Sequence, residues 1–255
     1  MSTSNFLPKI SIVTVVLNQK DLLAKTIDSV SSQDYINLEH VLIDGGSSDG
    51  TVEFIQKLKS PQIKSISEPD QGIYDAMNKG AKIAEGDWVI FLNSGDLFAG
   101  KTILSEVFSN YDTRQDLIYG DTFFISDGAE ELISARDVTM LWQALPFNHN
   151  SLFVKRDVLL EHPFEMDYKI VADSEFVIWA YKQGKSFHNT KIAINKYERG
   201  GYSDINSVMR TVERWKLVSD SSLKPQSEIN DYYFQRLLWE ESCQDYLRRT
   251  YNIKI

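Results

Sequence analysis

The residues best suited to chemistry in this chain form a short polar turn, Asn93-Ser94-Gly95-Asp96, directly after the apolar run Trp88–Leu92. A short apolar run bounded by turn residues is typical of a strand that is buried on both faces. Open α/β sheets bind ligands beyond the carboxyl ends of their strands, where this turn would lie. A carboxylate there can hold a hard divalent cation, which favours oxygen ligands and can bridge to a diphosphate. We therefore predict that Asp96 is a metal ligand and that Asn93 and Ser94 contact a diphosphate.

Two further polar turns follow the predicted strands Ile10–Leu17 and Leu38–Ile43. A carboxylate in such a turn can bind a ribose hydroxyl or a base edge, and glycine lets the backbone approach a ligand closely. The candidate contacts are Thr14, Asn18, Asp44 and Ser47. The alternative is a pair of ordinary turns in which Ser48 or Asp49 caps the next helix. We also expect Asn18 to cap the helix after the first strand.

The segments that position these turns alternate between strand and helix. The strands expected before Asp96 span residues 10–17, 38–43, 63–67 and 88–92, with helices over residues 23–30, 51–59 and 73–80 between them. Later strands are expected over residues 117–125, 132–134, 185–187 and 192–197. Later helices are expected over residues 103–108, 155–160, 173–183, 204–218 and 229–251. This pattern predicts an α/β fold with a Rossmann-like, mostly parallel sheet, flanking helices and a C-terminal helical extension.

Composition limits the class of protein. The chain has 255 residues and a formal net charge of −9, which argues against nucleic-acid binding because phosphate backbones need clustered Lys and Arg. The run at residues 10–17 is shorter than the roughly 20 residues that span a bilayer, and Met1–Asn5 lacks a basic signal-peptide region. Cys243 is the single cysteine, so no intrachain disulfide is expected. We expect a cytoplasmic protein, or one peripheral at the inner face of the plasma membrane. The polar stretch Ser219–Ser227 predicts a boundary between a catalytic domain (1–218) and a helical extension (219–255).

Three motifs together resemble one known family. They are Asp44-Gly45-Gly46-Ser47 with Asp49-Gly50-Thr51, then Glu68-Pro69-Asp70 through Gly80, then Asn93-Ser94-Gly95-Asp96. Over residues 10–203 the chain resembles bacterial family 2 glycosyltransferases with a GT-A fold, of the short type found in colanic-acid, capsule or O-antigen biosynthesis. The resemblance implies an inverting transfer of a sugar from a nucleotide donor (a UDP-, GDP- or dTDP-sugar), usually with Mn²⁺ or Mg²⁺.

The resemblance also implies roles for single residues. An inverting transfer needs a base beside the acceptor hydroxyl. In this family the base is an acid at the start of a helix, and Asp173 matches that place, with Glu175 as the alternative acid. Asp173 could instead be only a helix cap. His149 matches a histidine that could donate to a phosphate or to the acceptor, although a lone histidine is more often structural.

Two positions depart from the pattern of the family. Many relatives have an Asp-x-Asp type turn, whereas Asn93 replaces the first acid here, so Asp96 is expected to be the one protein carboxylate on the metal. Many relatives also carry Arg before the Asn of the helix. Met77 stands there in this chain, so the grip on the diphosphate is expected to pass to Lys79, whose alternative is a solvated helix residue. The donor contacts expected in this segment are Asp70, Asn78 and Lys79.

The C-terminal part carries weaker signals. Thr211–Trp215 is similar to the Gln-x-x-Arg-Trp sequence of processive polysaccharide synthases, but Thr211 replaces the Gln and no transmembrane helix is expected. We interpret it as ordinary helix and expect one sugar per reaction cycle. The aromatic residues of 229–251 fit a core stripe, a homodimer face or a peripheral membrane contact, and we favour packing on the catalytic domain.

The predicted function is transfer of one sugar from a nucleotide sugar to a glycan acceptor. The acceptor is expected to be linked to a lipid diphosphate and to serve surface polysaccharide biosynthesis. Two other classes stay open. A nucleotidyltransferase could use a similar sheet and metal, but its usual glycine-rich signature near the first strand is absent. A non-catalytic glycan-binding or scaffold protein would keep the fold and lose the base.

Overall fold

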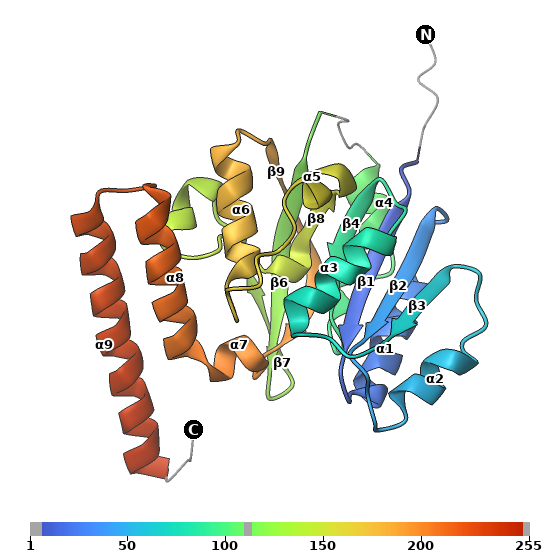
Figure 1. Cartoon of the computed structure of the whole chain (residues 1–255), viewed down its shortest axis with the longest axis horizontal. Helices are drawn as coiled ribbons and strands as arrows, with labels where there is room; N and C mark the ends of the chain where they lie inside the picture. Colours follow the sequence, from blue (N-terminus) through green and yellow to red (C-terminus); the bar gives the residue numbers. More distant parts are fainter. Residues whose placement is uncertain (1–6, 110–113, 252–255) are drawn as a thin grey trace.

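The computed structural model describes residues 7–109 and 114–251; for residues 241–251, which include Cys243, it describes the backbone of the helix alone. The described strands form one sheet in the order β3-β2-β1-β4-β8-β6-β9-β5, with β7 paired to β6 (Figure 1). The strands are β1 (Ile10–Val16), β2 (Leu38–Asp44), β3 (Ile63–Ser67), β4 (Trp88–Phe91), β5 (Leu97–Phe98), β6 (Leu117–Ser126), β7 (Ala129–Ile133), β8 (Leu152–Lys155) and β9 (Phe187–Glu198). The helices are α1 (Lys20–Ser31), α2 (Thr51–Lys57), α3 (Ile73–Ile83), α4 (Ile103–Phe108), α5 (Arg156–Glu161), α6 (Ala172–Lys182), α7 (Tyr202–Ile205), α8 (Ser207–Ser221) and α9 (Gln226–Tyr251), with short 3₁₀ helices η1 (Val138–Trp142) and η2 (His149–Ser151). The predicted α/β fold is confirmed.

Strands β1 to β4 form a parallel half of the sheet that is covered on both faces. β1 pairs with β2 and β4, and β2 pairs with β3. Leu23 and Ile27 of α1 and Ile55 of α2 pack on one face, and Tyr74 and Met77 of α3 pack on the other. This double cover explains why β1 and β2 are buried over their whole length. Because these strands run in one direction, their carboxyl ends meet at one edge of the sheet.

The other half of the sheet is mixed. β8 runs antiparallel to both β4 and β6, and β6 pairs in parallel with β9. The sequence predicted two separate strands over residues 185–187 and 192–197, and this was wrong, because β9 is continuous. Lys191 has a φ of 58°, and the register with β6 shifts on both sides of Asp121. The local irregularity interrupts the alternation of side chains without ending the strand.

The C-terminal helices belong to the main core. Figure 1 shows α8 and α9 side by side at the end of the molecule away from β3. Ile229 and Tyr233 of α9 are fully buried and share one apolar cluster with β1, α3 and α6. The Tyr233 hydroxyl donates to Trp142 O (2.9 Å). The boundary expected after residue 218 falls inside α8, which continues to Ser221.

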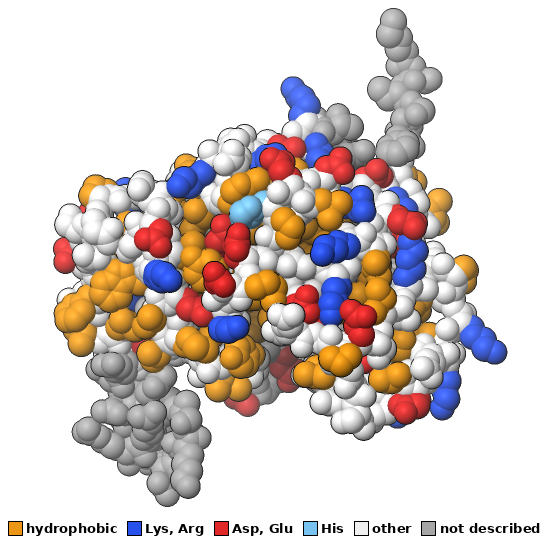
Figure 2. Space-filling model, in the orientation of Figure 1, with side chains coloured by type: hydrophobic (Ala, Val, Ile, Leu, Met, Phe, Trp, Pro, Cys, Tyr) orange, Lys and Arg blue, Asp and Glu red, His pale blue; other side chains and the backbone are white. Residues whose placement is uncertain are grey.

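The surface carries mixed charge and one apolar region. On the face drawn in Figure 2, acidic and basic side chains are interspersed, and hydrophobic side chains gather over α8 and α9. In α9, Phe234, Leu238 and Trp239 are exposed. Among the residues that the structure describes, no helix combines the length and the apolar character needed to cross a bilayer.

Candidate active site

The loops after β1 and β2 are fastened to each other at the edge where the parallel strands end. Asn18 N donates to Ser47 Oγ (2.7 Å), and Asn18 Oδ1 accepts from Ser48 N (2.8 Å). The expectation that Asn18 caps the next helix is therefore wrong. The capping position of α1 is Gln19, without a side-chain cap, and Asn18 instead has a φ of 53° and joins the two loops. Asn18 is exposed and Ser47 is partly exposed, so both side chains lie at the surface of this edge.

Two of the expected donor contacts are buried beneath these loops. Thr14 is fully buried, and its hydroxyl donates to Leu92 O (2.7 Å). Asp44 is also fully buried, and its carboxylate accepts from Gly46 N (3.1 Å) and from Ser67 Oγ (2.6 Å). A carboxylate that accepts from the backbone two residues ahead shapes a turn. Neither side chain has exposed surface with which to contact a donor, so both hold the loops in place.

Asp70 lies next to the turn after β2. A Cβ on Gly45 would stand 2.4 Å from Asp70 Oδ2, so the close approach requires glycine at position 45. Lys79 Nζ lies 2.9 Å from Glu68 Oε1 and 3.2 Å from Asp75 Oδ2. Lys79 therefore fastens the loop that carries Asp70 to α3, and its charge is already paired within the protein.

The remaining expected donor contacts differ in what they touch. The Asn78 side chain binds both the backbone N and the backbone O of Phe164 (2.9 Å each), so its amide is used to hold the segment after α5. Ser94 is partly exposed, and among the described residues its hydroxyl has a single, long contact of 3.5 Å with Gln19 O. Ser94 is thus available at the strand edge, whereas Asn78 is occupied.

Asp96 closes the turn after β4 and suits a divalent cation. Its side chain is 7% exposed, and its carboxylate accepts a hydrogen bond from the Asn150 amide. Burial raises the pKa of Asp96 well above its ordinary value, although the Asn150 donor opposes this shift. The Oδ1 atoms of Asn93 and Asn150 are buried without a hydrogen-bond partner among the described residues. A carboxylate beside two unpartnered amide oxygens is the kind of oxygen set that Mn²⁺ or Mg²⁺ prefers.

The protein does not supply a full coordination sphere at this place. The described residues contain no group of three or more His, Cys, Asp or Glu that could hold a metal ion. A cation on Asp96 would therefore need further oxygen ligands from a bound diphosphate or from water.

His149 connects the turn of Asp96 with the candidate base. Its Nε2 lies 3.2 Å from Asn93 Nδ2, and its Nδ1 lies 3.8 Å from Asp173 Oδ2. Burial lowers the pKa of His149 below its usual value, and the carboxylate of Asp173 partly offsets this, so the ring is neutral at pH 7. Because an amide NH₂ can only donate, Nε2 accepts from Asn93 and the ring proton sits on Nδ1, facing Asp173.

Asp173 stands in the first turn of α6 and lines a cavity of about 690 Å³ together with His149. Its Oδ1 accepts from Ser174 N (2.7 Å), and the Tyr74 hydroxyl, which donates to Ile170 O (2.6 Å), lies 3.4 Å from the same oxygen. A helix cap would accept from a backbone N–H two or three residues ahead, and α6 has no side-chain cap. Asp173 therefore does not cap its helix, and its carboxylate opens on the cavity.

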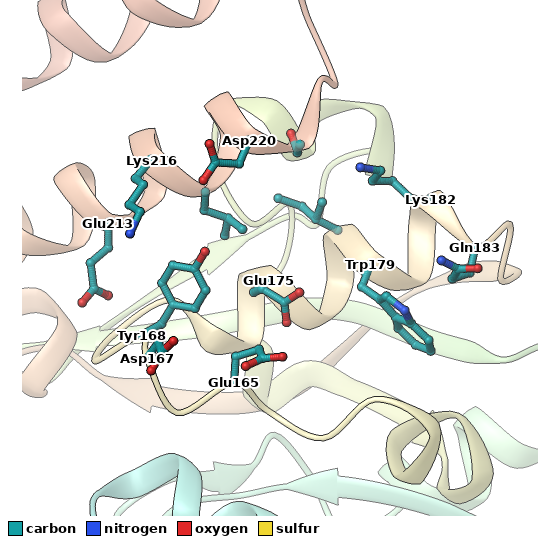
Figure 3. Close-up of a pocket in the computed structure, with 13 residues that line it drawn as sticks. Glu165, Asp167, Tyr168, Glu175, Trp179, Lys182, Gln183, Glu213, Lys216 and Asp220 are labelled. Atoms are coloured by element: carbon teal, nitrogen blue, oxygen red, sulfur yellow. The ribbon is translucent and has the colours of Figure 1, made fainter.

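Glu175 points to a different pocket (Figure 3). Its carboxylate lies 2.9 Å from His162 Nε2, and the His162 ring stacks on Trp179 with centroids 4.4 Å apart. In the same pocket, Glu213 accepts from the backbone N–H groups of Lys169 (3.0 Å) and Ile170 (2.9 Å). Glu175 and Glu213 thus hold α6 and α8 against the segment between α5 and α6, and Glu175 is separated from the group around His149.

The fold is that of GT-A glycosyltransferases. The structure is similar to Staphylococcus aureus TarS 1-349 in complex with UDP-GlcNAc, with a TM-score of 0.68, 17% identity and coverage of 97% of this chain and 76% of that one. It is also similar to the mannosyltransferase PcManGT from Pyrobaculum calidifontis in complex with GDP-Man and Mn²⁺, with a TM-score of 0.67, 16% identity and coverage of 93% and 76%. At such identities the likeness shows the fold.

The sequence places the chain in a family. Residues 11–166 match glycosyl transferase family 2, and the chain belongs to it. It is 32% identical over 178 residues to a PGL/p-HBAD biosynthesis glycosyltransferase of Mycobacterium bovis (strain BCG / Pasteur 1173P2), covering 67% of this chain and 69% of that protein. It is 25% identical over 238 residues to the chondroitin synthase of Pasteurella multocida (strain Pm70), covering 89% of this chain and 24% of that protein. The protein is thus a glycosyltransferase, as expected from its motifs.

Three residues of the site were not singled out from the sequence. Asn150 holds the carboxylate of Asp96, Tyr74 lies against Asp173, and Arg214 lines the cavity. Asn150 had a usable signal, because it is a polar residue directly before an apolar strand. Tyr74 had none, since an aromatic residue at helical spacing is most often packing. Arg214 had a weak one, because it stands at the Arg of the Gln-x-x-Arg-Trp sequence to which Thr211–Trp215 is similar, and we interpreted that segment as ordinary helix.

Proposed function

We propose that this enzyme transfers one sugar, with inversion, from a nucleotide sugar to a lipid-diphosphate-linked glycan acceptor in surface polysaccharide biosynthesis. The observation that carries the proposal is the position of His149 between the turn of Asp96 and the carboxylate of Asp173: its Nε2 lies 3.2 Å from Asn93 Nδ2, and its Nδ1 lies 3.8 Å from Asp173 Oδ2. Two carboxylates thus lie near one histidine, and in this proposal Asp96 holds the cation and Asp173 is the base. A transfer reaction needs both, one for the leaving diphosphate and one for the attacking hydroxyl.

In the proposed reaction, Asp173 accepts the proton of the acceptor hydroxyl as the oxygen attacks the anomeric carbon. The bond between that carbon and the diphosphate oxygen breaks, and the nucleoside diphosphate leaves. Ser174 N and the Tyr74 hydroxyl lie against Oδ1 of Asp173, so they orient the carboxylate while Oδ2 stays on the side of His149. A divalent cation on Asp96, when bound, would neutralise charge that builds up on the departing diphosphate.

The similar proteins support the donor class. TarS and PcManGT have been solved with UDP-GlcNAc and with GDP-Man and Mn²⁺, which supports a nucleotide sugar and a divalent cation for this chain. On the donor side, the exposed or partly exposed residues Asn18, Ser47, Asp70 and Ser94 are the proposed contacts. The relatives named for PGL/p-HBAD biosynthesis and chondroitin synthesis support a glycan or glycolipid acceptor. With a lipid-linked acceptor, the enzyme would act in the cytoplasm at the inner face of the plasma membrane.

A thermal-shift screen with UDP, GDP and dTDP, each with Mn²⁺ and with EDTA, tests the proposal. We expect one nucleotide to raise the melting temperature, and to do so more with Mn²⁺. The matching nucleotide sugar should then be slowly hydrolysed without an acceptor. If none of the three nucleotides shifts the melting temperature and no nucleotide sugar is hydrolysed, the protein is a non-catalytic member of the fold.

A further inference from the structure

The cavity that contains Asp173 is strongly cationic in a protein that is acidic as a whole. Among the residues that line it are five arginines, no lysine and two carboxylates, whereas the formal net charge of the chain is −9. The arginines are Arg136, Arg199, Arg210, Arg214 and Arg236. The second pocket, on the other side of α6 and α8, is lined by five carboxylates and two lysines. Helix α8 therefore separates a cationic cavity from an acidic one.

Arg214 is the buried member of the cationic set. It is 6% exposed, its Nη2 donates to Leu141 O, and the Tyr233 hydroxyl lies close to its guanidinium. Its Nε and Nη1 atoms are buried without a partner in the part of the chain that the structure describes. Burial lowers the pKa of Arg214, and the nearby Tyr233 and Asp173 oppose this, but a guanidinium keeps its charge in proteins. A buried, unpaired charge is expensive, so two unused donors here indicate a site for an anion.

The other arginines surround this position from different elements. Arg210 lies one turn earlier on α8, and its only ion pair, with Asp204, is loose at 3.5 Å. Arg236 comes from α9 and pairs with Glu240 at 3.1 Å. Arg136 follows β7, is exposed, and keeps its guanidinium available to the cavity. Planar guanidinium groups from three segments can bind phosphate oxygens in a bidentate manner.

We infer that the arginine-lined cavity binds a phosphate or diphosphate group of the acceptor, with Arg214 as its central ligand. The inference rests on the proposed function and assigns the residues that would bind the phosphate groups of the proposed acceptor. The same cavity holds Asp173, which places the anion on the side of the attacking hydroxyl. The donor diphosphate has its own place at Asp96, on the other side of His149. The donor diphosphate is the other phosphate group that these arginines could bind, and the experiment below distinguishes the donor from the acceptor.

The test is calorimetric titration of the full chain with inorganic pyrophosphate in EDTA, where the proposed donor site lacks its cation. We expect wild type to bind pyrophosphate in a salt-sensitive manner and Arg214→Gln to bind at least about tenfold more weakly, the scale for losing a hydrogen bond to a charged group. Asp96→Asn should bind as wild type does. Lys216→Gln is the matched control, because it removes a positive charge from the same helix on the side of the acidic pocket.

Two results would overturn the inference. One is that wild type does not bind pyrophosphate in EDTA, or that Arg214→Gln binds it as tightly as wild type does. The other is an equal loss of Mn²⁺–nucleoside diphosphate binding in Arg214→Gln, which would assign the arginines to the donor. Circular dichroism checks the fold, and Arg136→Gln, at an exposed position, carries the same expectation if the Arg214 variant does not fold. Failure of the proposed function would give a different result, because wild type would then bind no nucleotide, whether or not it binds pyrophosphate.

Discussion

Replacing Asp173 by Asn should remove the base while leaving the protein folded. Asn keeps an oxygen that can accept from Ser174 N, as Oδ1 does at 2.7 Å. Its NH₂ group would then face the ring proton on Nδ1 of His149, in place of the carboxylate oxygen 3.8 Å away. Two donors facing each other cost about 1 kcal/mol, which corresponds to a fall in melting temperature of about 2–4 °C for a chain of this size.

The effect on turnover should be far larger than the effect on stability. An amide cannot take the proton of the acceptor hydroxyl, and loss of acid–base help costs about 10²–10⁴-fold in rate, or about 3–5 kcal/mol of transition-state stabilisation. The assay is sugar transfer to a lipid-diphosphate glycan. Binding of Mn²⁺ and nucleoside diphosphate is measured on the same samples and should stay within about twofold of wild type.

Glu175→Gln is the control that makes this result interpretable. It removes a charge from the same first turn of α6 and breaks the contact with His162 (2.9 Å), at a cost of about 1 kcal/mol or less. Both variants should thus melt slightly earlier, and Asp173→Asn alone should lose activity. If Asp173→Asn keeps its activity and Glu175→Gln is inactive, the base is the other acid. If both are active, this site does not hold the base.

Three further predictions concern the metal, the histidine and the tail. Burial raises the pKa of Asp96, so the metal-free protein should lose stability as the pH rises above about 4, where the unfolded chain has released this proton. In thermal melts in EDTA, Asp96→Asn should make the melting temperature less dependent on pH in this range. The same variant should lose the extra stabilisation by Mn²⁺ and nucleotide. Burial lowers the pKa of His149, so kcat/KM should not change as the pH falls through 6.5. It should fall only at lower pH, where a proton added to Nε2 faces the NH₂ group of Asn93. A fall centred at pH 6.5 would contradict this arrangement. Tyr233 is 0% exposed, and Tyr233→Ala should lower the free energy of unfolding by about 3–5 kcal/mol. Trp239 is 66% exposed, and Trp239→Ala should change it by no more than about 0.5 kcal/mol. Equal melting temperatures of the two variants would mean that α9 does not share the core.

The parallel half of the fold was predictable because its signals are local. Apolar runs predicted β1 and β4, and helical spacing predicted α1 and α3. The behaviour of Asn18 was not predictable, since a polar residue after a strand suits a helix cap as well as a bridge to the next loop. Only the position of the Ser47–Ser48 turn, 29–30 residues further on, decides between the two.

The candidate site could be proposed residue by residue but not as a set of contacts. Asp96 was proposed from its place after a strand, and His149 and Asp173 from the resemblance to the family. Their proximity depends on contacts between residues 56 apart (Asn93 and His149) and 24 apart (His149 and Asp173), which no local pattern encodes. Burial was also not predictable from the local pattern. We predicted that Asp44 contacts the donor, whereas in the structure its carboxylate accepts hydrogen bonds from Gly46 N and Ser67 Oγ.

The division of the molecule bears on where acceptor specificity lies. The family match ends at residue 166, before α6, α8 and α9, and it covers the strand ends and the Asp96 turn. The candidate base and four of the five cavity arginines lie beyond it. Because α9 is built into the same core as the sheet, a change in the tail would alter the shape of the cavity as well as its charge. The acceptor should therefore be sought through α6 to α9, and the donor through the loops after β1, β2 and β4.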